Sequence, residues 1–294
     1  MRNEMKRCAF LSMDDIGDYY VYDELLIEPM ASQGWQVETV SWRTEHTDWR
    51  RFDAVILRSC WDYQQDPAAF MARLQEIARH TRVFNDLDTV RWNITKSYLR
   101  DIESAGIPIV PTYWPSHLNA GVVQQAMSHF NTPELIVKPL ISASAEHTYR
   151  LHEQQIDACL RDIAPVFSTR PLMLQPFIEN VTEEGELSLF YFDGAFSHAI
   201  RKVPKHGDFR VQEEHGGALY SINPESRVLE LAEKTLKAIP RRLLYARLDF
   251  IRYQQDYVVM ELELIEPSLY FNMDDDAAMR FVQAFKRMTE NSDA

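Results

Sequence analysis

The chain has 294 residues, enough for about two domains of ordinary size. It carries 31 Lys and Arg residues against 44 Asp and Glu residues, a formal net charge of −13, and 46% of its residues are hydrophobic. This composition is typical of a globular protein and excludes disordered, collagen-like and coiled-coil chains. The negative charge argues against general nucleic-acid binding and against an anionic membrane surface.

The cysteine pattern and the hydropathy indicate an intracellular setting. Cys8, Cys60 and Cys159 are far apart and form no zinc-binding spacing with each other or with histidines. The apolar stretch near the N-terminus is too short for a signal peptide, and no stretch approaches the roughly 20 apolar residues of a membrane span. We therefore expect a soluble, cytoplasmic protein without nucleic-acid or membrane partners.

The first hundred residues alternate between predicted strands and helices. Strands are predicted at residues 7–11, 36–42 and 53–58, and a helix is predicted between the third strand and Val83. Asp66 is its expected N-cap and Pro67 lies in its first turn. Strand and helix in alternation indicate a parallel sheet with crossover helices, which is an α/β lead domain.

The rest of the chain shows more antiparallel signals. A helix is predicted at residues 93–104, before an extended segment at 107–112. Residues 187–203 form a predicted β-hairpin with its turn at Asp193 and Gly194. The remaining elements are a hairpin of strands 246–252 and 257–265, and helices at 224–239 and 273–288. This pattern predicts an α+β domain after the α/β domain.

The clearest chemical signal is a group of carboxylates near the end of the chain. Glu261 and Glu263 lie on one face of a predicted strand, and Arg247 and Asp249 lie on one face of the strand before it. If the two strands pair, Asp249, Glu261 and Glu263 converge as three hard oxygen ligands for Mg²⁺ or Mn²⁺. The alternative is the solvated outer face of an edge hairpin.

A second signal is Lys138 within the apolar strand at residues 134–140. A lysine there is costly unless its ammonium group has a partner, and a strand lysine that reaches phosphate is known from phosphoryl transfer. The small residues at 142–145 follow at once and suit a flap over phosphates. The alternative is an edge-strand lysine that points to water.

Two further segments suit a nucleotide. Positive charge gathers at residues 201–210, and Gly216 and Gly217 permit close approach of the backbone to a ligand. The segment 172–178 reads as a buried strand whose pairing is interrupted by Pro176, which leaves backbone groups for an adenine edge. The alternatives are an ordinary hairpin end and an ordinary strand.

In the lead domain, Arg58, Trp61 and Asp62 follow the strand at 53–58. Open parallel sheets bind ligands at the carboxyl ends of their strands, so these residues are candidates for a substrate pocket. The alternative is a loop in which Trp61 packs and Arg58 pairs with Asp62. Nothing in the sequence supports Cys60 as a nucleophile.

Taken in order, these segments resemble the ATP-grasp superfamily, in particular its glutathione synthetase and peptide–glutamate ligase branch. The sharpest match is the run from Gly207 to Gly217 against the branch pattern G-[DE]-x-R-x-N-x-x-x-G-G, with Gln212 in place of Asn. The other matches, between about residues 93 and 267, are Lys96, Lys138-Pro139-Leu140, Gln175 to Ile178, Gly185-Glu186, Arg247-x-Asp249, and Glu261-x-Glu263 before Pro267. Segments 58–63 and 90–99 also resemble the group that contains the D-cycloserine-forming cyclo-ligase.

The resemblance implies an ATP-grasp fold of α/β and α+β parts. An N-terminal Rossmann-like pre-grasp domain is expected at residues 1–92 and the ATP-grasp region at 93–294, divided into 93–170 and 171–294. The implied function is an ADP-forming carboxylate–amine ligase that acts through an acyl phosphate on a small amino-acid-like substrate. The alternatives are an intramolecular cyclo-ligase, a phosphotransferase that stops at the phosphorylated acceptor, and a non-catalytic ATP-binding sensor. A homo-oligomer is common among similar enzymes.

The resemblance also implies roles for particular residues. Lys96, Lys138 and Lys202 would hold the phosphates of ATP, and Arg210 and Arg247 would be catalytic. The adenine and ribose would contact Gln175, Pro176, Phe177, Ile178 and Glu186. Asp249, Glu261 and Glu263 would hold two Mg²⁺ or Mn²⁺ ions, with Glu266 as a further candidate. Arg58, Trp61, Asp62, Gly216 and Gly217 would contact the carboxylate or the amine substrate. In this chain Glu263 replaces the usual Asn, and the flap at 142–145 lacks the usual glycines.

Overall fold

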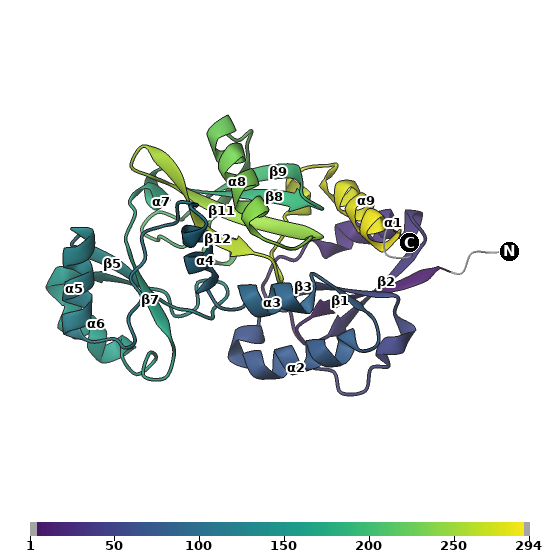
Figure 1. The fold of residues 1–294 in the computed structure, drawn as a ribbon, viewed down its shortest axis with the longest axis horizontal. Helices are drawn as coiled ribbons and strands as arrows, with labels where there is room; N and C mark the ends of the chain where they lie inside the picture. Colours follow the sequence, from purple (N-terminus) through teal and green to yellow (C-terminus); the bar gives the residue numbers. More distant parts are fainter. Residues whose placement is uncertain (1–4, 291–294) are drawn as a thin grey trace.

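The computed structural model describes residues 5–290. Its first part is a parallel sheet in the order β2 (Trp35–Ser41), β1 (Lys6–Ser12), β3 (Ala54–Ser59) and β4 (Arg82–Phe84) (Figure 1). Helix α2 (Pro67–Ala78) starts where Oδ1 of Asp66 accepts a hydrogen bond of 2.9 Å from the amide of Ala69. The apolar stripe of α2 packs in the same core as β1 and β3. The predicted α/β lead domain is therefore confirmed.

A small antiparallel sheet forms a second lobe (Figure 1). Its strand order is β6 (Tyr149–His152), β5 (Glu134–Pro139) and β7 (Leu172–Pro176). Helices α5 (Ala120–Phe130) and α6 (Ile156–Ile163) share one hydrophobic core with these strands. Because β7 pairs with β5, this sheet continues past the division expected after residue 170.

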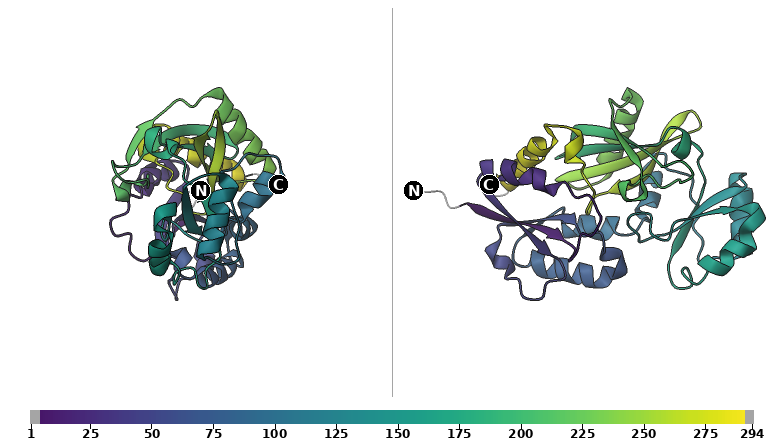
Figure 2. Two further views of the ribbon diagram at one scale, coloured as in Figure 1. Left: turned by 90° about the vertical axis from the view of Figure 1, so that its left-hand side faces the viewer. Right: turned by 180° about the vertical axis from the view of Figure 1, so that it is seen from behind.

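A five-stranded antiparallel sheet forms the third lobe, which lies beside both of the others (Figures 1 and 2). Its order is β10 (Ala218–Ser221), β9 (Ala195–Val203), β8 (Glu186–Phe192), β11 (Tyr245–Tyr253) and β12 (Asp256–Glu263). The β8–β9 turn has φ of 51° at Asp193 and 78° at Gly194, the left-handed pair that a tight hairpin requires. Both predicted hairpins are confirmed.

The two faces of the five-stranded sheet pack differently. One face packs against α8 (Ser226–Ala238) and α4 (Tyr98–Ser104). On the opposite face Phe190, Phe192 and Tyr245 pack against α9 (Ala277–Glu290) and the parallel sheet. Because side chains alternate along a strand, Glu186 and Ser188 of β8 share the face of Phe190, although they lie beyond the apolar core. One face of the sheet is thus apolar at one end and charged at the other.

The predicted helix at residues 93–104 is wrong as a continuous element. Helix α3 (Leu87–Asn93) ends before a turn at residues 94–97, and α4 begins at Tyr98. The side chain of Asn93 donates to the carbonyl of Leu262 and accepts from the amide of Leu264, at 2.9 and 3.0 Å. The chain is thereby tied to the end of β12 where the helix would have continued.

Smaller differences concern the ends of elements. β12 ends at Glu263 and α9 begins at Ala277, and neither β6 nor β10 was expected. The remaining elements are α1 (Ile27–Ser32), α7 (Asn180–Glu183) and the 3-10 turns Asp23–Leu26, Trp49–Arg51, Tyr63–Gln65, Glu153–Gln155, Glu213–His215 and Phe271–Met273. Across the described residues, every helix is too short or too polar to cross a lipid bilayer.

Candidate active site

A cavity that is open to solvent lies where the three lobes meet. All five predicted phosphate-binding and catalytic bases line it, and they come from three strands, one turn and one loop. These bases are Lys96, Lys138, Lys202, Arg210 and Arg247. Residues that are more than a hundred positions apart in the chain therefore share one site.

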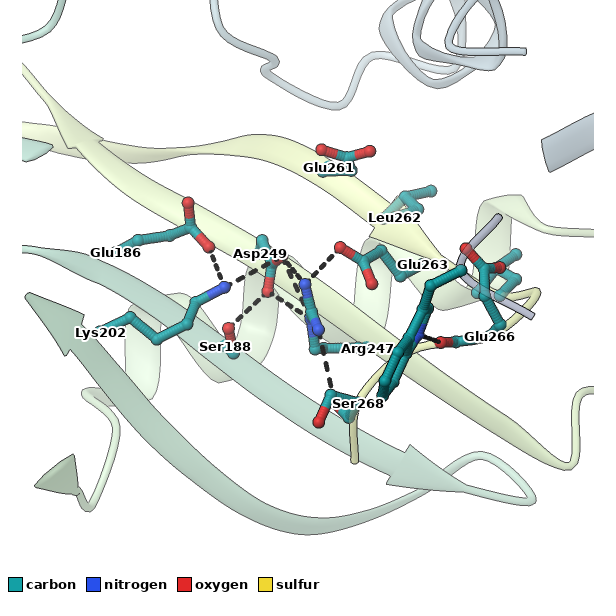
Figure 3. A network of polar contacts seen from close by, with 12 residues as sticks. Glu186, Ser188, Lys202, Arg247, Asp249, Glu261, Leu262, Glu263, Glu266 and Ser268 are labelled. Atoms are coloured by element: carbon teal, nitrogen blue, oxygen red, sulfur yellow. Dashed lines mark hydrogen bonds and ion pairs between the residues drawn. The ribbon is translucent and has the colours of Figure 1, made fainter. Parts of the chain in front are cut away.

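Lys202 belongs to a buried charge network that surrounds Asp249 (Figure 3). It stands opposite Glu186 in the β8–β9 ladder, and its ammonium contacts the carboxylate of Glu186 and lies 3.4 Å from Oδ2 of Asp249. Burial raises the pKa of Glu186 to about 7, and Lys202 opposes this shift. Burial lowers the pKa of Lys202, but Asp249 and Glu186 outweigh it and the net shift is upward. The ammonium of Lys202 therefore stays charged.

Asp249 is held by a second cation on its own strand. Arg247 donates to both carboxylate oxygens, at 3.1 Å to Oδ1 and 2.9 Å to Oδ2, and it also contacts Glu263. The hydroxyl of Ser188 donates to Oδ1 at 2.5 Å. Burial opposes ionisation of Asp249, but Arg247 and Lys202 lower its pKa to about 2. Asp249 is therefore a carboxylate at neutral pH.

The turn at residues 94–97 carries Lys96 into the cavity. The amide of Lys96 donates to the carbonyl of Leu140 at 2.8 Å, and its ammonium donates to the carbonyl of Ser142 at 3.1 Å and to Oε1 of Glu261 at 2.5 Å. Lys96 thus connects the start of the flap to β12. The same turn that breaks the predicted helix places this lysine at the site.

Lys138 differs from the other bases of the cavity. Its side chain is buried in the wall of the cavity, and nothing among residues 5–290 forms a hydrogen bond or ion pair with its ammonium. Burial lowers the pKa of Lys138 to about 8, although Glu261 opposes the shift. A buried ammonium without a bonded anion is a favourable place for a ligand phosphate.

The three predicted metal ligands converge on adjacent strands. Asp249 stands opposite Glu261, and Arg247 stands opposite Glu263. Each carboxylate is bonded to a cationic side chain, and within residues 5–290 no three acidic, histidine or cysteine side chains form a preformed metal site. Hard oxygen donors on neighbouring strands nevertheless fit Mg²⁺ or Mn²⁺ in chemistry, once Lys96 and Arg247 turn to other anions.

Glu266 also lines the cavity, three residues beyond Glu263. Burial and, to a smaller extent, the nearby Glu263 raise the pKa of Glu266 to about 8. Figure 3 shows its carboxylate beyond Glu263, on the side away from Lys202. Its environment therefore differs from that of the three paired carboxylates.

The segment at the end of β7 forms an apolar part of the wall. Gln175, Pro176, Phe177 and Ile178 all line the cavity together with the apolar side chains of Val110, Val181, Ile251 and Met260. Nε2 of Gln175 donates to Oγ1 of Thr112 at 2.9 Å, and the guanidinium of Arg150 lies 3.6 Å from the ring centroid of Phe177. This wall suits a flat apolar ring such as adenine.

Of the predicted substrate residues in the lead domain, Trp61 lines the cavity and Arg58 and Asp62 do not. Arg58 is 1% exposed, and its Nη2 lies 2.7 Å from Oδ1 of Asp23. Asp62 accepts hydrogen bonds of 2.7 Å from the indole of Trp42 and from Nε of Arg43. The alternative pairing of Arg58 with Asp62 is therefore wrong, and Arg58 lies away from the cavity. Asp62 lines an adjoining hollow together with Trp61 and Arg210.

Gly216 and Gly217 lie outside the lining of the cavity. Gly216 has φ of 82°, and a Cβ at Gly217 would lie 2.1 Å from the carbonyl oxygen of Val211. These glycines therefore let the loop at 205–217 fold closely upon its own backbone and the side chain of Lys205. The loop in turn places Arg210, whose guanidinium pairs with Asp208 at 2.7 Å, at the cavity.

Some residues of the site carried no recognised signal in the sequence. Ser188 has the same period-two placement as Glu186, which is a signal that could have found it. Tyr22 and Glu213, joined by a hydrogen bond of 3.1 Å, connect the lead domain to the loop at 205–217. Tyr19, Tyr63 and Tyr270 line the cavity from segments without a motif.

The fold and the site together define a class of protein. An α/β lobe and two antiparallel lobes enclose a cavity with two lysines from separate sheets, a third lysine on a turn, and carboxylates on adjacent strands. This is the arrangement of an ATP-grasp enzyme, which holds a nucleotide between two antiparallel sheets.

Comparisons with known proteins agree with this class. Residues 8–85 match the family model of the D-cycloserine synthetase DcsG N-terminal domain, and residues 113–271 match that of the prokaryotic glutathione synthetase ATP-grasp domain. The cycloserine biosynthesis protein DcsG of Streptomyces lavendulae is 30% identical over 275 residues, covering 88% of this chain and 91% of that protein. The chain belongs to the ATP-grasp ligase family that includes D-cycloserine synthetase DcsG.

Solved structures show the same fold. The crystal structure of D-cycloserine synthetase DcsG has a TM-score of 0.87 and 27% identity, covering 96% of this chain and 99% of that chain. D-alanine–D-alanine ligase from Bacillus anthracis has a TM-score of 0.69 at 13% identity, covering 98% of each chain, and shows the fold alone. The predicted ATP-grasp fold is confirmed, and the protein is an ATP-dependent ligase that forms carbon–nitrogen bonds. ATP-grasp ligases in general use ATP and divalent metal ions.

Proposed function

We propose that this protein phosphorylates the carboxylate of a small amino-acid-like substrate with ATP and then transfers the acyl group to an amine. The observation that carries this proposal is the convergence of five basic side chains from the two antiparallel lobes and the turn at residues 94–97 on one cavity. Transfer of a phosphoryl group to a carboxylate brings two anions together, so neutralisation of charge is the main task of the protein.

The lysines have the positions that phosphate binding requires. Lys138 is buried and its ammonium has no bonded anion among the described residues, and Lys96 connects the flap to β12. Lys202 is held in place by its contact with Glu186, the residue for which the family resemblance implies a contact with the ribose. The apolar wall at residues 175–178 would take the adenine ring, as the family resemblance implies.

Asp249, Glu261 and Glu263 would hold the divalent ions, for which two Mg²⁺ or Mn²⁺ ions are expected. When bound, such ions neutralise phosphate oxygens and orient the transferred group. For this role Glu261 would have to separate from Lys96, and Glu263 from Arg247. The two cationic side chains would then contact the phosphates of ATP. Asp249 stays ionised throughout, since Arg247 and Lys202 lower its pKa.

The reaction proceeds in two steps. A carboxylate oxygen of the substrate attacks the γ-phosphorus of ATP, the bond from that phosphorus to the β–γ bridging oxygen breaks, and ADP leaves. A neutral amine then attacks the acyl carbon, the carbon–oxygen bond breaks, and phosphate leaves with the proton of the amine. Arg247 and Arg210 line the cavity and would stabilise the charge on the transferring group.

The flap supports the exclusion of water. Residues 143–145 line the cavity, and Ser144, Ala145 and His147 have φ between 49° and 56° although none is glycine. The amide of Gln64 donates to Oε2 of Glu146 at 3.2 Å, which joins the flap to the lead domain. Such a cover would protect the acyl phosphate from hydrolysis.

A second candidate function is ring closure within one substrate. The observation that favours it is the similarity to DcsG, a D-cycloserine synthetase, across both the lead domain and the ATP-grasp region. In this case the attacking nitrogen and the phosphorylated carboxylate belong to the same molecule. The chemistry of activation and the residues that carry it stay the same.

An ADP-release screen tests the proposal. The protein with ATP and Mg²⁺ is offered pairs of amino acids and small carboxylates, together with amino acids that carry a ureido or aminooxy nitrogen, and products are identified by mass spectrometry. An amide identifies the ligase, and a product formed from one substrate with loss of a small molecule identifies ring closure. Tight ATP binding without ADP release from any carboxylate would overturn the proposal in favour of a sensor.

A further inference from the structure

Glu266 is a cavity carboxylate that the phosphate chemistry does not use. Among the described residues, no other side chain forms a hydrogen bond or ion pair with its carboxylate, whereas Asp249, Glu261 and Glu263 are each bonded to a cation. Figure 3 places Glu266 at the end of a row that starts at Lys202 and passes through Asp249 and Glu263. Glu266 therefore lies at the end of the network that is farthest from Lys202.

Aromatic side chains of the lead domain surround this end of the cavity. The indole Nε1 of Trp61 donates to the carbonyl oxygen of Glu266 at 2.8 Å, so the ring is fixed beside this residue. The ring of Tyr19 packs on Trp61 with centroids 5.2 Å apart, and Tyr63 lines the same cavity. A carboxylate beside aromatic rings is a favourable environment for an ammonium group, because the rings attract a cation and the carboxylate pairs with it.

We propose that Glu266 and Trp61 bind the ammonium group of a small amino acid. The reaction activates the carboxylate of this amino acid, and its ammonium nitrogen is not acylated. The inference rests on the proposed function and assigns the residues that recognise the amino group of its substrate. The carboxylate that is phosphorylated belongs to an amino acid with a free amino group. The carboxylate of the substrate then points along the row of side chains toward Arg247 and Lys202, while its ammonium group stays at Glu266.

This assignment makes Glu266 a specificity residue. A partly buried carboxyl group without a partner is costly to ionise, and the substrate ammonium removes this cost on binding. A neutral analogue without the amino group leaves Glu266 unpaired, so the site rejects it. The competing assignment, a further carboxylate ligand of the metal ions, predicts a different dependence on Mg²⁺.

The test compares matched ligands in the ADP-release assay. Serine is compared with 3-hydroxypropanoate, and alanine is compared with propanoate. Every other amino acid that supports turnover is likewise compared with the same molecule without its amino group. The wild type is expected to favour the amino acid at least tenfold in kcat/KM. Glu266→Gln should raise KM for the amino acid at least tenfold, leave KM for the des-amino acid and for ATP within twofold, and so abolish the preference. Glu103→Gln, on the exposed side of α4, is the matched control and should keep the preference.

Three results would overturn the inference. These are a wild type without preference for the amino acid, a Glu266→Gln variant that keeps the preference, and a variant whose main change is a higher requirement for Mg²⁺. In all three the wild type still releases ADP. Failure of the proposed function is distinguishable, because the wild type then releases no ADP with any carboxylate, and the substrate inference falls with it.

Discussion

The ammonium of Lys96 lies 2.5 Å from Oε1 of Glu261, so that an expected phosphate ligand and an expected metal ligand neutralise each other in the ligand-free protein. Arg247 and Glu263 form a second contact of the same kind. Each pair must open before either partner takes up its ligand. We therefore expect nucleotide and metal binding to be coupled, because phosphates that attract the cationic side chains would also release the carboxylates.

Removal of the Lys96 side chain should change metal binding and ATP turnover in opposite directions. Lys96→Met frees Glu261, so the apparent Kd for Mn²⁺ in the absence of ATP should fall severalfold, while ADP release falls at least 100-fold. Calorimetry with Mn²⁺ alone and the ADP-release assay measure the two effects. Unchanged Mn²⁺ affinity in Lys96→Met would show that Glu261 is not a metal ligand.

Lys138 should bind phosphate in the complex and destabilise the folded protein in the absence of a ligand. Its ammonium is buried without a bonded partner, so Lys138→Met should raise the free energy of unfolding at pH 7 by roughly 1–3 kcal/mol and abolish ADP release. Denaturant unfolding measures the gain, and Lys237→Met on the exposed face of α8 is the control.

The pH dependence of that gain has a defined sign. The folded pKa of Lys138 is lowered from 10.5 to about 8, so the unfolded chain binds more protons between these two values. The destabilising effect of Lys138 is therefore complete below about pH 8 and disappears as the pH rises toward 10.5. A gain for Lys138→Met that is the same at pH 7 and pH 10 would contradict burial of a charged ammonium.

Arg58 should be important for stability and not for substrate use. It is 1% exposed and pairs with Asp23, and Arg58→Met would leave that carboxylate buried without its partner. Such a loss costs about 3–5 kcal/mol. We expect a clear fall in Tm, with substrate KM of the folded enzyme within about threefold of the wild type. A raised substrate KM at unchanged Tm would instead support the substrate role that the sequence suggested.

The two adjacent glycines should differ in their tolerance of a side chain. At Gly217 a Cβ would lie 2.1 Å from the carbonyl oxygen of Val211, and at Gly216 it would lie 3.3 Å from a carbon of the flexible Lys205 side chain. Gly217→Ala should disorder the loop that carries Arg210, with loss of most of the activity. Gly216→Ala should cost about 1 kcal/mol through its positive φ and keep activity within a fewfold range. Equal effects of the two variants would refute the close contact at Gly217.

The parts of the site that lie on strands were predictable from the sequence. Side chains alternate between the two faces of a strand, so residues two positions apart share a face whatever the rest of the fold is. Glu261 and Glu263 had to share a face, and pairing of the two strands brought Asp249 opposite Glu261. The position of Lys138 in an apolar strand indicated a buried ammonium in the same way. The order of these motifs then indicated the fold.

The residues that the sequence misplaced depend on contacts between distant segments. Asn93 ends its helix because its side chain bonds the backbone around Leu262 and Leu264, and helical periodicity contains no information about that contact. Arg58 lies at the end of a strand, where ligands often bind, but its guanidinium forms an ion pair with Asp23. Asp23 lies in a segment without any motif. Ser188 gains its role from Asp249, which lies 61 positions away.

The central claim is that the substrate carboxylate attacks ATP and forms an acyl phosphate. The most direct measurement uses a substrate from the ADP-release screen with both carboxylate oxygens labelled with ¹⁸O, and follows the label by mass spectrometry. The account predicts that each released phosphate carries one ¹⁸O atom, because the oxygen that attacks phosphorus leaves with it when the amine attacks carbon. Unlabelled phosphate, with all of the ¹⁸O retained in the organic product, would contradict the account.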